Sequence, residues 1–89
     1  MTAERIARLE QRLRAALDPA ELEIEDDGAA HAGHAGARQG GHFNVVVVSE
    51  AFVGKPLLAR HRLVYEAAGD MMQTDIHALS IKALTPEER

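Results

Sequence analysis

The first part of the chain changes from a helical pattern of apolar residues to a strand-like one. Near the N-terminus, apolar residues recur at spacings of three and four, as on a helix with one buried face: Ile6, Leu9, Leu13 and Leu17. Asp18-Pro19 follows, and we expect the helix to end there because the residue before a proline disfavours helical backbone. Leu22 to Glu25 then alternates apolar and acidic residues, which predicts a half-buried strand.

The second part of the chain predicts a strand, a helical segment and a further strand. His42 to Ser49, with four consecutive valines at its centre, has the composition of a strand. Pro56 is expected at the first position of a helix. Gly69 weakens this helix by roughly 1 kcal/mol relative to alanine, so a break there into two pieces is expected. Ile76 to Leu84 predicts the last strand, followed by a charged tail at 85–89. The apolar stripe of the helix is expected to contain Leu57, His61, Val64, Ala68 and Met71, extended by Leu58, Tyr65 and Met72.

This order of elements predicts a small α+β domain. A helix between the second and third strands favours a right-handed crossover, which makes those two strands parallel. The first two strands are expected to pair as an antiparallel hairpin. The result is a three-stranded mixed sheet with the helices packed on one face, and at 89 residues the chain is expected to be a single domain, 1–89.

The connection between the first two strands is unusually long and contains two histidines. Asp26 to Gly41 spans sixteen residues, rich in glycine and alanine, and includes His31 and His34. Hairpin connections usually have about 2 to 5 residues, and longer loops are commonly functional or disordered. A flexible linker is therefore an alternative of equal weight. Imidazoles suggest a metal site, and because the chain has no cysteine, any thiolate ligands must come from a partner.

Composition and charge exclude several classes of function. The chain lacks cysteine, so it has no disulfide framework and no cysteine nucleophile, and no serine stands in a nucleophile-elbow motif. We therefore predict that the protein is not an enzyme. The charged N-terminus does not resemble a signal peptide, and no apolar run approaches the roughly 18 residues of a membrane span. These features predict a cytoplasmic protein without a membrane partner, and the net charge of −4 disfavours non-specific binding of polyanions.

The chain from His42 onward contains four short motifs: His42-Phe43-Asn44-Val45, Phe52-x-Gly54, Arg60-His61-Arg62-x-Val64-Tyr65 and Ile76-His77-Ala78-Leu79. Taken with the element order, these motifs resemble the BolA family from about Glu4 to Glu88. The resemblance implies an αββααβ domain of the class II KH-like type. It also implies partnership with a monothiol glutaredoxin in iron–sulfur cluster assembly, trafficking or iron regulation, although some bacterial members are transcriptional regulators.

The resemblance further implies a set of metal ligands. His77 matches the family's cluster ligand, and the second ligand is expected from the loop, where His34 is favoured over His31. A glutaredoxin cysteine and glutathione would supply two thiolates to a bridged [2Fe–2S] cluster in a heterodimer, so no cofactor is expected in the isolated chain. His42 and His61 are weaker candidates, expected to be structural, with His42 otherwise facing solvent.

A basic segment is the candidate surface for a partner or for nucleic acid. Lys55, Arg60 and Arg62 lie close together in an otherwise acidic chain, and the two arginines are expected to point outward on either side of His61. Such a patch could bind a glutathione carboxylate, a glutaredoxin surface or DNA phosphates. The alternative function is therefore a DNA-binding transcriptional regulator that uses this helix, and the alternative for the patch is an ordinary solvated helix face.

Overall fold

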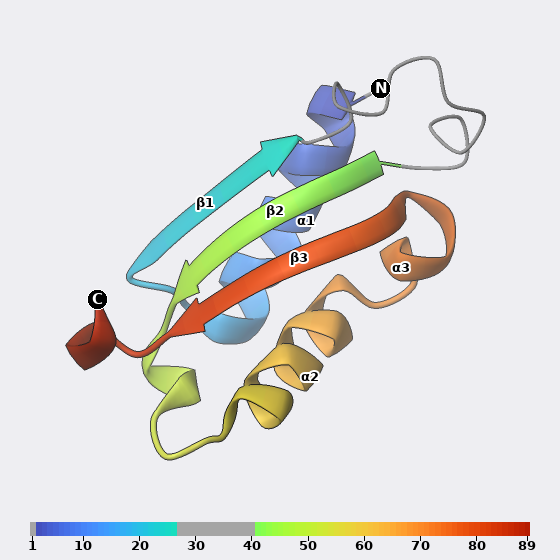
Figure 1. The fold of residues 1–89 in the computed structure, drawn as a ribbon. Helices are drawn as coiled ribbons and strands as arrows, with labels where there is room; N and C mark the ends of the chain where they lie inside the picture. Colours follow the sequence, from blue (N-terminus) through green and yellow to red (C-terminus); the bar gives the residue numbers. More distant parts are fainter. Residues whose placement is uncertain (1, 27–40) are drawn as a thin grey trace.

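The computed structural model describes residues 2–26 and 41–89, and the order of the elements confirms the αββααβ prediction (Figure 1). Most of the predicted loop, residues 27–40, lies outside the described residues. No helix in the described ranges is long and apolar enough to cross a membrane. The elements are α1 (Thr2–Leu17), β1 (Glu21–Asp26), β2 (Gly41–Val48), the 3₁₀ helix η3 (Glu50–Phe52), α2 (Leu57–Ala68), α3 (Met71–Thr74), β3 (Ile76–Leu84) and the 3₁₀ helix η4 (Pro86–Glu88).

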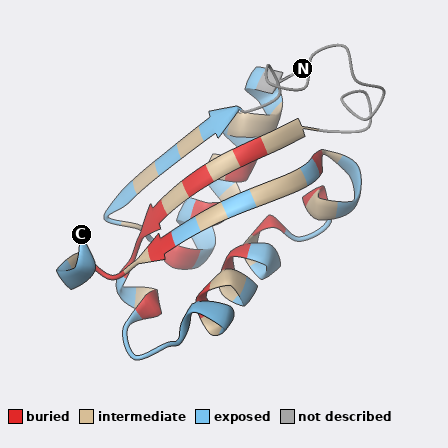
Figure 2. Cartoon of the chain, viewed as in Figure 1, coloured by how far each residue is buried: buried red, intermediate tan, exposed pale blue. Residues whose placement is uncertain are grey.

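The three strands form one mixed sheet in the order β1-β2-β3. β1 and β2 are antiparallel, whereas β2 and β3 are parallel, as the crossover rule predicted. Phe43, Val45 and Val47 alternate as buried residues along β2, seen as red bands on that strand in Figure 2, and they share the core cluster with residues of α1 and α2. The sheet therefore has one face in the core and one face that carries polar residues.

α1 buries the face that its sequence pattern predicted. Leu9, Leu13 and Leu17 are buried in the core, and Ile6 packs against its edge. The helix ends at Leu17, and Asp18 adopts a positive φ of 44° before Pro19. Asp and Asn tolerate this conformation better than other non-glycine residues, which explains how the chain turns here toward β1.

α2 shows one difference from the sequence prediction. Its buried positions are Arg60, Val64 and Ala68, whereas Leu57 at the predicted start of the stripe is 64% exposed. The buried face is displaced because Arg60, which was expected to point outward, packs inward with its long stem. Pro56 caps the helix instead of occupying its first position.

The predicted break at Gly69 is confirmed. Gly69 has φ +59° and ψ −131°, and its N–H donates to the carbonyl of Tyr65 to close α2. Glycine reaches this backbone region without the steric cost that a Cβ adds. The chain then forms the short α3, which leads directly into β3.

Candidate metal centre

His77, the predicted cluster ligand, lies at the start of β3 and its side chain is exposed. Gly41 pairs with Ile76, but the next residue, His42, pairs with Ala78, so His77 is an extra residue on the β3 side of the ladder. An irregularity of this kind re-aims side chains relative to a regular strand. Here it allows two consecutive residues of β3, His77 and Ala78, to stand opposite the single residue His42.

A second imidazole lies beside His77. The ring centroids of His42 and His77 are 4.9 Å apart, and the ring planes are inclined by 36°. The prediction that treated His42 as a weaker, structural candidate did not anticipate this pairing. A signal for it was nonetheless present in the sequence, because both histidines lie at the beginnings of predicted strands, His42 first and His77 second, and the two strands were predicted to be parallel.

The loop histidines are the other predicted ligands, and both His31 and His34 lie outside the described residues. The two residues that flank this loop, Asp26 and Gly41, are described. Asp26 pairs with Phe43, and Gly41 N–H donates to the carbonyl of Asp75 at 3.0 Å. Both ends therefore lie at the same edge of the sheet as His42 and His77.

The described donors amount to half of a typical coordination sphere. In the ranges 2–26 and 41–89, no group of three or more His, Cys, Asp or Glu side chains could hold a metal ion. The His42–His77 pair offers two imidazoles, which are suitable ligands for iron, zinc, copper and nickel. The donor set therefore fits a metal or cluster that is shared with further ligands.

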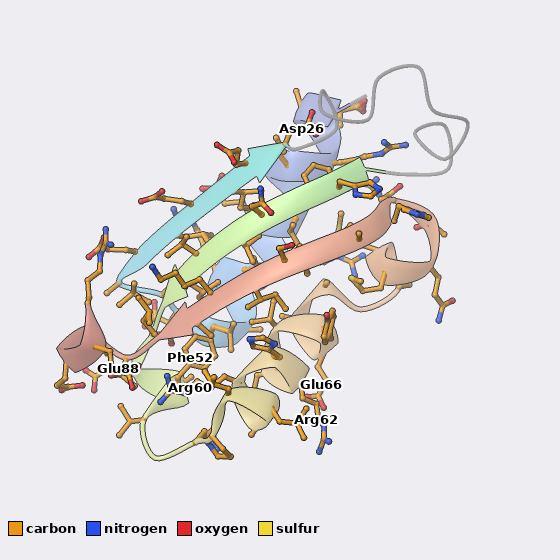
Figure 3. All side chains as sticks on the ribbon, in the orientation of Figure 1. Asp26, Phe52, Arg60, Arg62, Glu66 and Glu88 are labelled. Atoms are coloured by element: carbon orange, nitrogen blue, oxygen red, sulfur yellow. The ribbon has the colours of Figure 1, made fainter. Side chains whose placement is uncertain are left out.

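Arg60 corrects the prediction of an outward-facing basic patch. Only 8% of its surface is exposed, because its guanidinium donates to the carbonyls of Lys55 and Ala83 at 2.7 and 3.1 Å. It also donates to the two carboxylate oxygens of Glu88 at 2.6 and 3.1 Å, and the two side chains face each other in Figure 3. This bidentate pair lowers the pKa of Glu88 to about 2. Arg60 thus holds the C-terminal turn and does not project toward a partner.

The remaining cations, Lys55 and Arg62, are exposed among apolar side chains. The exposed large hydrophobic residues of the described structure all lie between residues 53 and 65. Residues 58, 62 and 65 share one face of α2 by their spacing, and Figure 3 shows Arg62 pointing away from the sheet. We call this region the α2 surface: Val53, Lys55, Leu57, Leu58, Arg62 and Tyr65.

The α2 surface and the imidazole pair are separate sites. Lys55 is tied through Arg60 to Ala83, which lies six residues beyond His77 in β3. At about 3.3 Å per residue, this part of the strand is roughly 20 Å long. The structure therefore places the predicted ligand His77 and the predicted partner contact Lys55 toward opposite ends of the sheet (Figure 1).

Comparison with known proteins identifies the family. The BolA-like protein family model matches residues 13–88. The chain belongs to the BolA family. It is 47% identical over 87 residues to SufE-like protein 1, chloroplastic/mitochondrial, of Arabidopsis thaliana, covering 91% of this chain and 24% of that protein. It is 40% identical over 81 residues to the DNA-binding transcriptional regulator BolA of Escherichia coli (strain K12), covering 91% of this chain and 75% of the regulator.

Solved structures of BolA-family members confirm the fold. The BolA domain of SufE1 from Arabidopsis thaliana superposes with a TM-score of 0.82 at 48% identity, covering 93% of each chain. BolA1 from the same plant gives a TM-score of 0.83 at 42% identity, covering 96% of this chain and 95% of that one. The curated Protein BOLA1, chloroplastic, is longer, and the matched region covers 55% of it. This chain thus spans about a quarter to a half of these two curated plant relatives.

In this BolA-family chain, α1 fixes the segment that leads to His77. Arg8 forms an ion pair with Asp75, two residues before His77, and Arg12 donates to Asp70 at 2.7 Å. The same Arg12 atom donates to the carbonyl of Ala68 at 2.9 Å. The Arg12 guanidinium also lowers the pKa of Asp70. The position of α3, and with it the start of β3, is therefore anchored on the N-terminal helix.

Proposed function

We propose that this chain is a partner of a monothiol glutaredoxin in iron–sulfur cluster assembly, trafficking or iron regulation. The observation that carries the proposal is the exposed His77 imidazole, which stands beside a second imidazole at the sheet edge where residues 27–40 join β1 to β2. Membership of the BolA family supports the same assignment. The function is one of ligand donation and contact with a partner, without catalysis by this chain.

In the proposed complex, this chain contributes nitrogen ligands and the partner contributes sulfur. His77 and a loop histidine, His34 or His31, would bind a bridged [2Fe–2S] cluster that passes between the proteins as cargo. The two thiolates would come from a glutaredoxin cysteine and from glutathione, because this chain has no cysteine. Histidine ligands raise the reduction potential relative to thiolates, and they bind metal only when neutral. Cluster sharing is therefore expected to weaken in acid.

The proposal is tested by mixing the chain with a monothiol glutaredoxin that carries its cluster and glutathione. We expect the visible and EPR spectra to change as nitrogen replaces part of the sulfur ligation, and we expect His77→Ala to prevent the change. The double variant His31→Ala/His34→Ala measures the contribution of the loop. His61→Ala, on the partly buried side of α2, is the matched histidine control. A spectrum that does not change on mixing would refute the proposal.

A second candidate function is DNA binding, favoured by the name of the relative from Escherichia coli, a DNA-binding transcriptional regulator. The α2 surface supports it less well than it supports a protein partner. Arg60 is held by Glu88, and the exposed Lys55 and Arg62 stand among apolar side chains instead of in a continuous basic stripe. The net charge of −4 also opposes approach to a polyanion.

A gel shift at moderate salt distinguishes the two functions. The double variant Lys55→Ala/Arg62→Ala is compared with the unaltered chain, and cluster sharing is measured in parallel with His77→Ala. Loss of DNA binding in the first variant, together with intact cluster sharing in the second, would favour the regulator. We expect the reverse, weak DNA binding that is insensitive to the double variant and cluster sharing that depends on His77.

A further inference from the structure

We propose that His42 and His77 form a two-imidazole chelate for a borderline divalent transition-metal ion, such as Cu²⁺, Ni²⁺ or Zn²⁺, in the isolated chain. The inference goes beyond the proposed function because it requires no glutaredoxin, no glutathione and no loop histidine. It assigns a ligand role to His42, which the sequence alone placed among the weaker candidates.

The spacing of the rings suits a shared ion. With a metal–nitrogen distance of about 2.1 Å, two imidazoles bound to one ion at tetrahedral or right angles have ring centroids about 4.5 to 5.3 Å apart. The observed separation between the His42 and His77 centroids is 4.9 Å. The observed separation therefore lies within the range that two imidazoles on one ion adopt.

The backbone that carries the two rings is fixed. Phe43 and Ile76, the chain neighbours of His42 and His77, are 2% and 3% exposed and lie in the core. Gly41 N–H donates to the carbonyl of Asp75 at 3.0 Å, which ties the two strand starts together. A Cβ added at Gly41 would lie 2.4 Å from Cε2 of Phe43, so this close approach requires glycine. Donors held on strands lose less conformational freedom on binding than donors on a free loop.

The chemistry of the donors sets the class of ion. Neutral imidazole is a good ligand for copper, nickel and zinc, whereas calcium and magnesium prefer oxygen. Cu²⁺ is expected to bind most tightly because it stands at the top of the Irving–Williams order. Two protein ligands leave positions for water, so the site would be open to further ligands.

The test uses tag-free protein in which His31→Ala/His34→Ala removes the loop imidazoles. We titrate this parent with Cu²⁺ and follow EPR hyperfine structure from bound nitrogen. We expect one equivalent to bind. Adding His42→Ala or His77→Ala is expected to weaken binding at least about 10- to 100-fold, the loss typical even of an outer-shell partner. His61→Ala in the same parent is the control and should leave the affinity unchanged.

A second measurement avoids dependence on the folding of any variant. In the same parent, Zn²⁺ should shift the NMR signals of the His42 and His77 imidazoles together, at the same metal concentration, and leave those of His61 in place. Unaltered Cu²⁺ affinity in His42→Ala, or a Zn²⁺ shift confined to one of the two rings, would overturn the chelate. Neither outcome would contradict the glutaredoxin proposal. That proposal is tested separately, by the effect of His77→Ala on the spectrum of the cluster carried by the glutaredoxin.

Discussion

Arg60 illustrates how a single charged residue can organise three segments of a small fold. Its guanidinium joins the turn before α2, the end of β3 and the C-terminal η4 through Lys55, Ala83 and Glu88. No buried side-chain nitrogen or oxygen in the described ranges lacks a hydrogen-bond partner. Burial of this charge is therefore tolerated because its donors are satisfied. The pattern of α2 could not reveal it, since the carboxylate lies 28 residues away in the sequence.

The Arg60–Glu88 pair makes part of the stability depend on pH. Glu88 has a pKa of about 2 in the folded chain, whereas an unfolded glutamate has a pKa of about 4.3. The pair therefore stabilises the fold fully above about pH 5, and this contribution is lost as the pH falls toward 2. We expect Glu88→Gln to lower the free energy of unfolding at pH 7 and to have a much smaller effect near pH 2.

Urea denaturation between pH 2 and 7 measures this difference. The neighbouring exposed Glu87→Gln is the matched control, since it removes the same charge from the same turn without touching Arg60. A difference between Glu88→Gln and the unaltered chain that stayed constant over the whole range would show that the ion pair does not carry the stabilisation.

Among the elements, the strands were predicted more closely than the faces of the helices. The predicted third strand, Ile76 to Leu84, has the observed bounds, and the valine-rich strand differs from its prediction by one residue at each end. Period-two patterns and turn residues determine these limits locally. The buried face of α2 could not be read as well, because Leu57, Leu58 and Val64 are equally apolar and only tertiary packing decides which of them is covered.

A pair of alanine substitutions tests the assignment of that face. Val64 is 0% exposed, so Val64→Ala is expected to cost about 2 to 3 kcal/mol of unfolding free energy through lost burial and a residual cavity. Leu57 is 64% exposed, and Leu57→Ala is expected to change the stability by less than about 0.5 kcal/mol. Equal losses in denaturant titrations would mean that both side chains pack in the core.

The break between α2 and α3 gives a second prediction at this scale. Gly69 has φ +59°, and an added Cβ would lie 3.0 Å from Nη1 of Arg12. We expect Gly69→Ala to lower the free energy of unfolding by about 1 to 3 kcal/mol, because φ +59° with ψ −131° lies in a region that residues with a Cβ rarely adopt. Gly54→Ala is the control, because Gly54 also has a positive φ of 76° but nothing lies within 4 Å of its Cβ position. Thermal or urea unfolding measures both losses. A smaller loss when Gly69→Ala is introduced into an Arg12→Ala chain would report the contact with Arg12, and an unchanged loss would show that this contact adds nothing.

The candidate metal centre depends on register, which the sequence does not specify fully. His77 could be predicted as a candidate ligand from its sequence motif and from its position at the start of a strand. His42 and His77 come together beside an irregularity in the β2–β3 ladder, between Gly41 and His42, and the sequence pattern does not reveal that irregularity. The prediction that Arg60 points outward was wrong for a related reason. Its burial and its pairing with Glu88 arise only when the chain folds and brings distant segments together.

At the scale of the whole molecule, the described structure places the imidazole pair and Lys55 of the α2 surface, our proposed ligands and proposed partner contact, toward opposite ends of β3. The imidazole pair lies where β2 and β3 begin, whereas Lys55 lies near the end of β3, roughly 20 Å away along the strand. Substitutions at the two sites should therefore act on different measurements and should add independently, as is usual for sites more than about 10 Å apart.

Charge reversal at the α2 surface tests this separation. We expect Lys55→Glu and Arg62→Glu each to weaken the complex with glutaredoxin about three- to tenfold at low salt, because both cations are exposed on the α2 surface, which we propose as the contact with the partner. The effect should shrink as salt is raised and screens the charges. Lys82→Glu is the control, since Lys82 is an exposed cation on β3 outside the α2 surface and its reversal changes the net charge by the same amount.

The same binding measurement on His77→Ala distinguishes association with the glutaredoxin from ligation of its cluster. This variant is expected to keep most of its affinity for apo glutaredoxin while the cluster spectrum reverts to that of the glutaredoxin alone. The charge-reversed variants should show the opposite behaviour, with weaker association but an unaltered spectrum once saturated. Titration by calorimetry and visible absorption on the same samples distinguishes these cases.

If Lys82→Glu weakened the complex as much as Lys55→Glu, net charge alone would account for the effect, and the α2 surface would not be the contact. If His77→Ala abolished association, the two ends of the sheet would act as a single site.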